Sequence, residues 1–216
     1  MRSADTIGPV SGVVPDLREL RDCGWSTVVG RLAECGWVRL PGALSQESVD
    51  ALIASRRVDW HDLPEVEGHV HQQGQGAYQP LAECEDAVRR FASELVDQLS
   101  EAAAAGGWSA VPKFNEVTWT FYPEGTGHIT PHRDPPAYGG VVAVCTLVGR
   151  ASFSILDGEP PTQWFTAPGD VVVLCGHGWP RPDSLCPRHT VEPPERGDRM
   201  IMTLRSNRRG AGAPYL

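Results

Sequence analysis

Residues 115–136, NEVTWTFYPEGTGHITPHRDPP, mark the point where the pattern of the chain changes from helical to β. Alternating Thr and aromatic residues predict a strand at 115–122, Pro and Gly predict a turn after it, and residues 127–132 predict a second strand. Short segments rich in Val, Ile and Thr continue downstream, near residues 141–148, 151–156, 163–166, 170–175, 189–192 and 199–206. About eight short strands separated by Gly, Pro and Asp are typical of a β-sandwich or jelly roll.

The residues upstream carry helical patterns. Apolar positions at helical spacing predict helices at about 18–36, 46–57 and 83–105, with a short strand at 36–42 between the first two. Residues 58–82 lose that spacing and accumulate Gly, Gln and His. We therefore predict a long functional loop in this segment.

Length and composition indicate one globular domain. The 216 residues suffice for a single core, so we predict one α+β domain, with a helical part at about 1–107 packed on one sheet of a jelly-roll core at about 108–206. The formal net charge of −8, from 27 acidic and 19 basic residues, lacks the basic footprint of a nucleic-acid binder. No apolar window is long enough to span a membrane and the first residues do not resemble a secretory signal, so we expect a cytoplasmic protein.

His132 and Asp134 lie at the end of the second predicted strand. Alternate residues of a strand point to the same face, so the imidazole and the carboxylate can bind one metal ion together. A histidine with a carboxylate suits a borderline divalent metal such as Fe(II). A His-x-Asp pair alone is more often a surface pair, so the hypothesis depends on a third ligand.

The third ligand has three candidates. His189 lies in a predicted strand after a Pro- and Gly-rich loop, His177 lies in that loop, and His128 shares a predicted strand with His132. We favour His189 for its placement in the strand pattern. Two histidines and one carboxylate leave coordination positions open for a cosubstrate and oxygen.

Arg199 opens the last predicted strand, ten residues after His189. The period of two places Arg199 on the same face as Ile201, Thr203 and Arg205. An arginine on an inward strand face requires an anion, and a guanidinium binds a carboxylate in a bidentate manner. The anion is either an internal Asp or Glu, or the far carboxylate of a dicarboxylate cosubstrate whose keto acid binds the metal.

Together these residues resemble the iron and 2-oxoglutarate motif of the non-haem Fe(II)/2-oxoglutarate dioxygenases. The resemblance rests on His132-x-Asp134, the distal His189 and Arg199, and covers roughly residues 36–206. It implies a double-stranded β-helix core, which is a distorted jelly roll, with His132, Asp134 and His189 as iron ligands and catalytic residues. It further implies a hydroxylase that uses Fe(II), 2-oxoglutarate and O2.

Two features are similar to the AlkB-like branch of that superfamily. Arg199 and Arg205 form an Arg-x5-Arg spacing, and Tyr122 precedes His132 by ten residues, as do the residues that hold 2-oxoglutarate in that branch. Thr120 stands where the branch usually has Asn. We therefore expect Thr120, Tyr122, Arg199 and Arg205 around the cosubstrate, whereas the departure at Thr120 and the acidic composition disfavour a nucleic-acid demethylase.

The substrate is predicted from weaker signals. The predicted loop at 68–79 and the segment 176–181 before the distal histidine offer polar and aromatic side chains, which are His69, His71, Gln73, Gln75, Tyr78, Trp179 and Arg181. Small size and acidity favour hydroxylation of a small molecule, such as an amino acid, a nucleoside or a specialised metabolite, without nucleic-acid or membrane partners. The alternatives are an AlkB-like nucleic-acid demethylase and a non-catalytic cupin-like metal-binding module.

Overall fold

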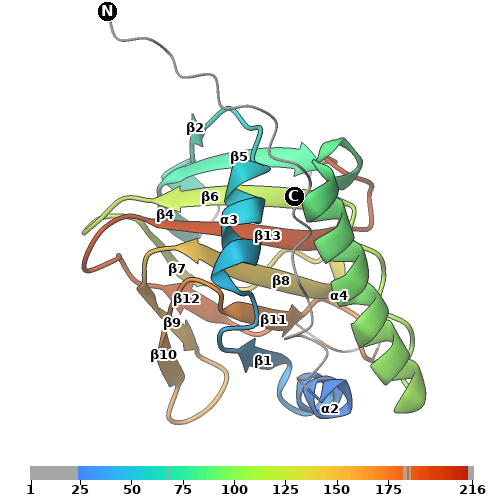
Figure 1. The fold of residues 1–216 in the computed structure, drawn as a ribbon. Coiled ribbons are helices and arrows are strands. Elements are labelled where there is room, and N and C mark those ends of the chain that lie inside the picture. The colour runs from blue at the N-terminus through green and yellow to red at the C-terminus, as the bar shows by residue number, and fades with distance from the viewer. Residues whose placement is uncertain (1–23, 68, 182–183, 185, 214–216) are drawn as a thin grey trace, which may run out of the picture.

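The computed structural model describes residues 24–67, 69–181, 184 and 186–213. Its strands form two antiparallel sheets, one of seven strands in the order β1-β11-β8-β13-β6-β5-β2 and one of six in the order β10-β9-β12-β7-β4-β3. Figure 1 shows the helices lying on one side of the seven-stranded sheet. The predicted α+β arrangement, with helices packed on one sheet, is confirmed.

The helices begin and end where the sequence provides caps. Helix α2 spans Trp25–Cys35, α3 spans Gln46–Ala54 and α4 spans Asp86–Ala105. Ser45 caps α3 by accepting a hydrogen bond from a backbone N–H of the first turn, and α2 ends at Gly36, whose φ of 80° favours glycine. Residues 18–23 of the first predicted helix lie outside the described residues. No described helix has the length and apolar character to cross a membrane.

All eight strands predicted after residue 108 are present. The seven-stranded sheet consists of β1 (Trp37–Leu40), β11 (Val171–Cys175), β8 (Tyr138–Val148), β13 (Arg199–Asn207), β6 (Glu116–Tyr122), β5 (Gln75–Pro80) and β2 (His61–Asp62). The six-stranded sheet consists of β10 (Thr162–Thr166), β9 (Ala151–Ile155), β12 (His189–Val191), β7 (His128–His132), β4 (Val70–Gln73) and β3 (Val66–Glu67).

The seven-stranded sheet carries an apolar layer on each face. Met200, Met202 and Leu204 of β13 pack with the helices in one cluster. Ile201 belongs to a second cluster, which joins side chains from both sheets. Because neighbouring residues of a strand face opposite sides, β13 directs Arg199 and Ile201 together into the space between the sheets.

The prediction of a long loop at 58–82 is wrong. The segment contains β2, β3, β4 and β5, followed by the 3-10 helix η1 (Leu81–Glu83). β5 pairs with β6 from Gln75 opposite Phe121 to Pro80 opposite Glu116, and β4 pairs with β7. Gly has low strand propensity and Gln is not among the strand-favouring residues, so these strands depend on backbone pairing with partners distant in sequence, which local composition does not reveal.

Candidate metal centre

Two histidines meet on neighbouring strands of the six-stranded sheet. His132 ends β7 and His189 begins β12, and the two residues are direct partners in the antiparallel register. Their ring centroids lie 4.3 Å apart with an angle of 54° between the ring planes. The register then shifts, because Val191 pairs with Ile129. This irregularity breaks the period of two along β7, and His132 lines the adjacent cavity whereas His128 does not.

Main-chain carbonyls hold both imidazoles. His132 Nδ1 lies 2.9 Å from the carbonyl oxygen of Thr130, and His189 Nδ1 lies 2.9 Å from that of Pro187. A carbonyl oxygen only accepts, so Nδ1 of each ring carries the proton and Nε2 keeps its lone pair. Metal-binding histidines are oriented in this way. Both Nε2 atoms can therefore bind a metal ion.

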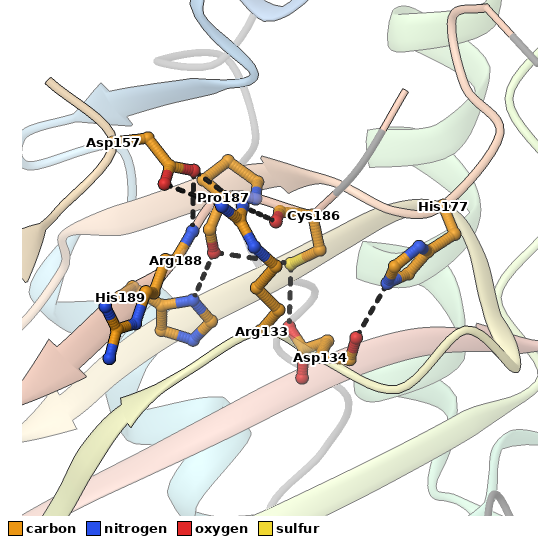
Figure 2. Close-up of polar contacts among 8 residues, drawn as sticks. All are labelled: Arg133, Asp134, Asp157, His177, Cys186, Pro187, Arg188 and His189. Atoms are coloured by element: carbon orange, nitrogen blue, oxygen red, sulfur yellow. Dashed lines mark hydrogen bonds and ion pairs between the residues drawn. The ribbon is translucent and has the colours of Figure 1, made fainter. Parts of the chain in front are cut away.

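Asp134 is buried beside this pair and is held by three neighbours. Its Oδ2 accepts a hydrogen bond from Cys186 Sγ at 3.5 Å, and its Oδ1 lies 3.8 Å from Arg205 Nη2. His177 Nε2 donates to its main-chain carbonyl at 2.8 Å. Figure 2 shows Cys186 reaching the carboxylate and His177 reaching the main chain of Asp134. Ligand atoms of Asp134, Cys186 and His189 all lie within 4.8 Å of one another.

Burial and neighbouring charges set the protonation of these groups. Burial, followed by the adjacent His189, lowers the pKa of His132 to about 4, so this ring is neutral at pH 7. Burial opposes ionisation of Asp134, but Arg205 and the two histidines outweigh it and lower the pKa of the carboxyl group. A neutral imidazole and an ionised carboxylate are the forms in which these side chains bind divalent cations.

Arg199 lies fully buried between the two sheets. Its Nη2 lies 3.4 Å from Thr146 Oγ1, and its guanidinium lies over the Tyr122 ring at 5.7 Å. Nε and Nη1 have no hydrogen-bond partner among the described residues, and no described Asp or Glu pairs with the group. Burial lowers the pKa of Arg199 to about 10, which still leaves it charged at pH 7. Such a group fits an anionic ligand.

A cavity of about 700 Å³ opens beside the histidines. Its wall contains five residues that the sequence predicted for the metal and the cosubstrate, which are Thr120, Tyr122, His132, Asp134 and Arg205. His177, a candidate for the third ligand, also lines it, as do residues without a predicted site role, among them Gln72, Thr118, Ile129, Tyr138 and Arg188. Tyr138 and Thr118 carried no sequence signal, since their roles depend on how β6 and β8 pair with β13.

Of the residues predicted to contact substrate, His69 lines the cavity. His71 and Gln73 flank Gln72 in β4, and because neighbouring residues of a strand face opposite sides, Gln72 reaches the cavity instead of them. Gln75 belongs to β5, where its amide donates to Asp62 Oδ1 at 3.1 Å.

The remaining three predicted contacts lie away from the cavity. Trp179 is buried in the helix-side core, where its Nε1 donates to the carbonyl of Ser109 at 3.0 Å. The guanidinium of Arg181 lies 5.4 Å from the ring of Trp108. Tyr78 is among the exposed large side chains on β5. The structure therefore does not bring these three residues together with the metal-binding candidates.

Solved structures resemble the chain, although no family model and no curated protein matches it. A prolyl-4-hydroxylase from Pseudomonas putida aligns with a TM-score of 0.65 at 23% sequence identity, over 85% of this chain and 99% of that chain. An oxidoreductase of the 2OG-Fe(II) oxygenase family from Burkholderia pseudomallei aligns with a TM-score of 0.61 at 16% identity, over 88% of this chain and 93% of that chain. The chain has the fold of the 2OG-Fe(II) oxygenases.

A third structure with this fold contains a metal ion and 2-oxoglutarate. HygX from Streptomyces hygroscopicus, with nickel and 2-oxoglutarate bound, aligns with a TM-score of 0.53 at 14% identity, over 83% of this chain and 85% of that chain. The predicted likeness to the 2OG-Fe(II) oxygenases is therefore confirmed at the level of the overall fold. Within this fold, the rings of His132 and His189 lie 4.3 Å apart, and the carboxylate of Asp134 lies beside His189. The guanidinium of Arg199 lies over the ring of Tyr122, which lines the same cavity as His132 and Asp134.

Proposed function

We propose that the chain is an Fe(II)- and 2-oxoglutarate-dependent oxygenase that hydroxylates a small molecule, such as an amino acid, a nucleoside or a specialised metabolite. One observation carries the proposal: the buried guanidinium of Arg199 has no acidic partner among the described residues. A buried structural arginine is normally paired. An arginine that receives the carboxylate of a cosubstrate needs no such partner.

We assign iron to His132, Asp134 and His189. Cys186 competes with His132, because its sulfur lies in the same group of ligand atoms as Asp134 and His189. Burial raises the pKa of the Cys186 thiol, which therefore keeps its proton and donates a hydrogen bond to the carboxylate of Asp134. His132, in contrast, offers an Nε2 without a proton. Cys186 is therefore assigned as a support of Asp134 and not as a ligand.

We assign 2-oxoglutarate to the space between the iron ligands and Arg199. A buried guanidinium whose Nε and Nη1 have no partner among the described residues still has hydrogen-bond donors to give to the far carboxylate. Burial raises the pKa of Tyr122, so its hydroxyl stays protonated and can donate to the same ligand, and Thr120 lines the cavity from the same strand. The positive charge of Arg205 is paired with the proposed metal ligand Asp134. We therefore assign Arg199 as the residue that binds the far carboxylate of 2-oxoglutarate.

Iron with bound 2-oxoglutarate supplies an oxygen-dependent hydroxylation that is coupled to decarboxylation of 2-oxoglutarate. The chain contributes orientation. The carbonyls of Thr130 and Pro187 fix the two imidazoles, and Cys186 and Arg205 fix the carboxylate of Asp134. Rigid ligands of this kind hold the reacting groups close together and lower the entropy that is lost at the transition state.

The proposal includes the finer fold and the extent of the domain. We propose that the two sheets form a double-stranded β-helix and that residues 1–216 form one domain. Supporting this, side chains from both sheets share one apolar cluster, and the seven-stranded sheet shares its other face with the helices. Neither the helices nor the six-stranded sheet has an apolar cluster of its own among the described residues.

Oxygen-dependent conversion of 2-oxoglutarate to succinate tests the function without a known substrate. Wild-type protein with Fe(II) is expected to produce succinate slowly, and His132→Ala and Asp134→Ala are expected to lose both iron and turnover. His128→Ala removes a histidine from the same strand outside the cavity and is the matched control, with expected wild-type turnover. Equal turnover in all four proteins would show that iron binds elsewhere.

A further inference from the structure

The cavity carries a charge opposite to that of the whole chain. The chain has a formal net charge of −8. Among the described residues that line the cavity, three are arginines (Arg133, Arg188 and Arg205) and one, Asp134, is a carboxylate. Low-dielectric walls concentrate such a local charge, and a concave positive surface on an acidic protein attracts anions.

Two of the three arginines already have carboxylate partners. Arg205 lies 3.8 Å from Asp134 and donates to Thr118 Oγ1 at 2.8 Å. Arg133 forms a bidentate pair with Asp157, with Nη1 to Oδ2 at 2.6 Å and Nη2 to Oδ1 at 2.7 Å. These contacts fix both guanidiniums within the protein and neutralise their charges.

Arg188 differs from the other two. Its backbone N–H donates to Asp157 Oδ2 at 2.9 Å, and this oxygen already accepts from Arg133. The side chain of Arg188 is exposed, lines the cavity, and makes no hydrogen bond or ion pair with another described side chain. Figure 2 shows it extending away from the Asp157 carboxylate on the side where His189 lies. The guanidinium that pairs with Asp157 is that of Arg133, and the surplus positive charge belongs to Arg188.

The rest of the cavity wall suits an apolar body. Leu63, Val70 and Ile129 lie in it, together with the ring of Tyr138. Cavities that bind small molecules combine such surfaces with a few polar groups that fix orientation. Arg188 directly precedes His189, so the exposed charge and a proposed iron ligand come from adjacent residues of the chain.

We propose that Arg188 binds an acidic group of the substrate, a carboxylate or a phosphate, while the apolar part of the substrate lies against Val70, Ile129 and Tyr138. This inference rests on the proposed function and specifies its substrate class. The group is not 2-oxoglutarate itself: Arg199, the proposed anchor for 2-oxoglutarate, is buried between the sheets and is not part of the cavity wall. Saturation with 2-oxoglutarate therefore leaves Arg188 available.

Calorimetry under anaerobic conditions, with Fe(II) and saturating 2-oxoglutarate, tests the proposal with three probes: hydrocinnamate, its neutral isostere hydrocinnamamide, and phenyl phosphate. Wild-type protein is expected to bind one of the anions at least about tenfold more tightly than the amide, because a hydrogen bond between two charged groups is stronger than one to a neutral group. Arg188→Gln is expected to abolish that preference. Arg150→Gln, which removes an exposed charge outside the cavity, is expected to retain it.

The two anions identify the acidic group, since the preferred one shows whether the site takes a carboxylate or a phosphate. The proposal is overturned if neither anion binds below roughly 10 mM, if acid and amide bind equally, or if the preference survives in Arg188→Gln. The visible band of the iron–2-oxoglutarate chelate, recorded on the same samples, tests the proposed function separately. If the band is absent, the same titrations on the metal-free protein still decide whether Arg188 binds anions.

Discussion

Arg199→Met is expected to stabilise the protein in the absence of 2-oxoglutarate and to remove the stabilisation that 2-oxoglutarate gives. Burial lowers the pKa of Arg199 from 12.5 to about 10. Each pKa unit corresponds to about 1.4 kcal/mol, so the fold disfavours the charged form of Arg199 by about 3 kcal/mol. Methionine keeps an apolar stem without the charge, but it loses the contact with Thr146. We therefore expect a net gain of about 1–3 kcal/mol.

Thermal unfolding under anaerobic conditions with Fe(II) measures both effects. Without 2-oxoglutarate, the midpoint of the variant is expected to rise by about 2–12 °C, at about 2–4 °C per kcal/mol for a chain of this size. With 2-oxoglutarate at about 100 times its Kd, the wild-type protein gains about 2.7 kcal/mol and the variant gains little. With 2-oxoglutarate, the difference between the two unfolding midpoints therefore becomes smaller or changes sign.

Arg150→Met provides the matched control, because it removes an exposed guanidinium that lies over the ring of Phe165. It is expected to leave the midpoint and its response to 2-oxoglutarate unchanged. If Arg199→Met is less stable than wild type without 2-oxoglutarate, and responds to 2-oxoglutarate as the wild type does, Arg199 is a structural residue and not an anion site.

Three further predictions concern the metal ligands. The pKa of His132 is about 4 in the fold against 6.5 in the unfolded chain, so on acidification the unfolded state takes up the proton first. The free energy of unfolding of the metal-free protein, measured by urea titration, should therefore fall by up to about 3 kcal/mol between about pH 6.5 and pH 4, and that of His132→Gln should fall by less. Cys186→Ala removes the hydrogen-bond donor to Asp134 Oδ2, so the affinity for iron, measured by competition with a chelator, should fall at least about tenfold. An unchanged affinity would show that the thiol does not support Asp134 as a ligand. Arg205→Met removes the largest charge that lowers the pKa of Asp134, so iron should dissociate at a higher pH than from wild type, and an unshifted release curve would contradict this.

The β core was predictable because its strands are rich in β-branched and aromatic residues and are separated by Gly and Pro. The metal-binding candidates were predictable from spacing: His132 and Asp134, two residues apart, both line the cavity, although Asp134 follows the end of β7, and Arg199 lies on the same strand face as Ile201. Each of these inferences uses residues close together in sequence, where the geometry of a strand is sufficient.

The strands at 61–80 and the substrate contacts were not predictable in this way. β5 exists because β6 offers it a partner, and the face of each residue in β4 follows from pairing with β7. The pairing irregularity between β7 and β12, which separates His128 from His132, also has no local signal. Cys186 and Arg188 reach the site because a loop returns to β12 beside β7, a tertiary arrangement that spacing along the chain does not contain.

Anaerobic titration of the metal-free protein with Fe(II) and then 2-oxoglutarate tests the central claim most directly. The chelate of 2-oxoglutarate with iron gives a weak visible charge-transfer band. We predict this band for wild type and for His128→Ala, and its loss in His189→Ala. A folded wild-type protein without the band, or a band of undiminished affinity in His189→Ala, would contradict the assignment of iron to His132, Asp134 and His189.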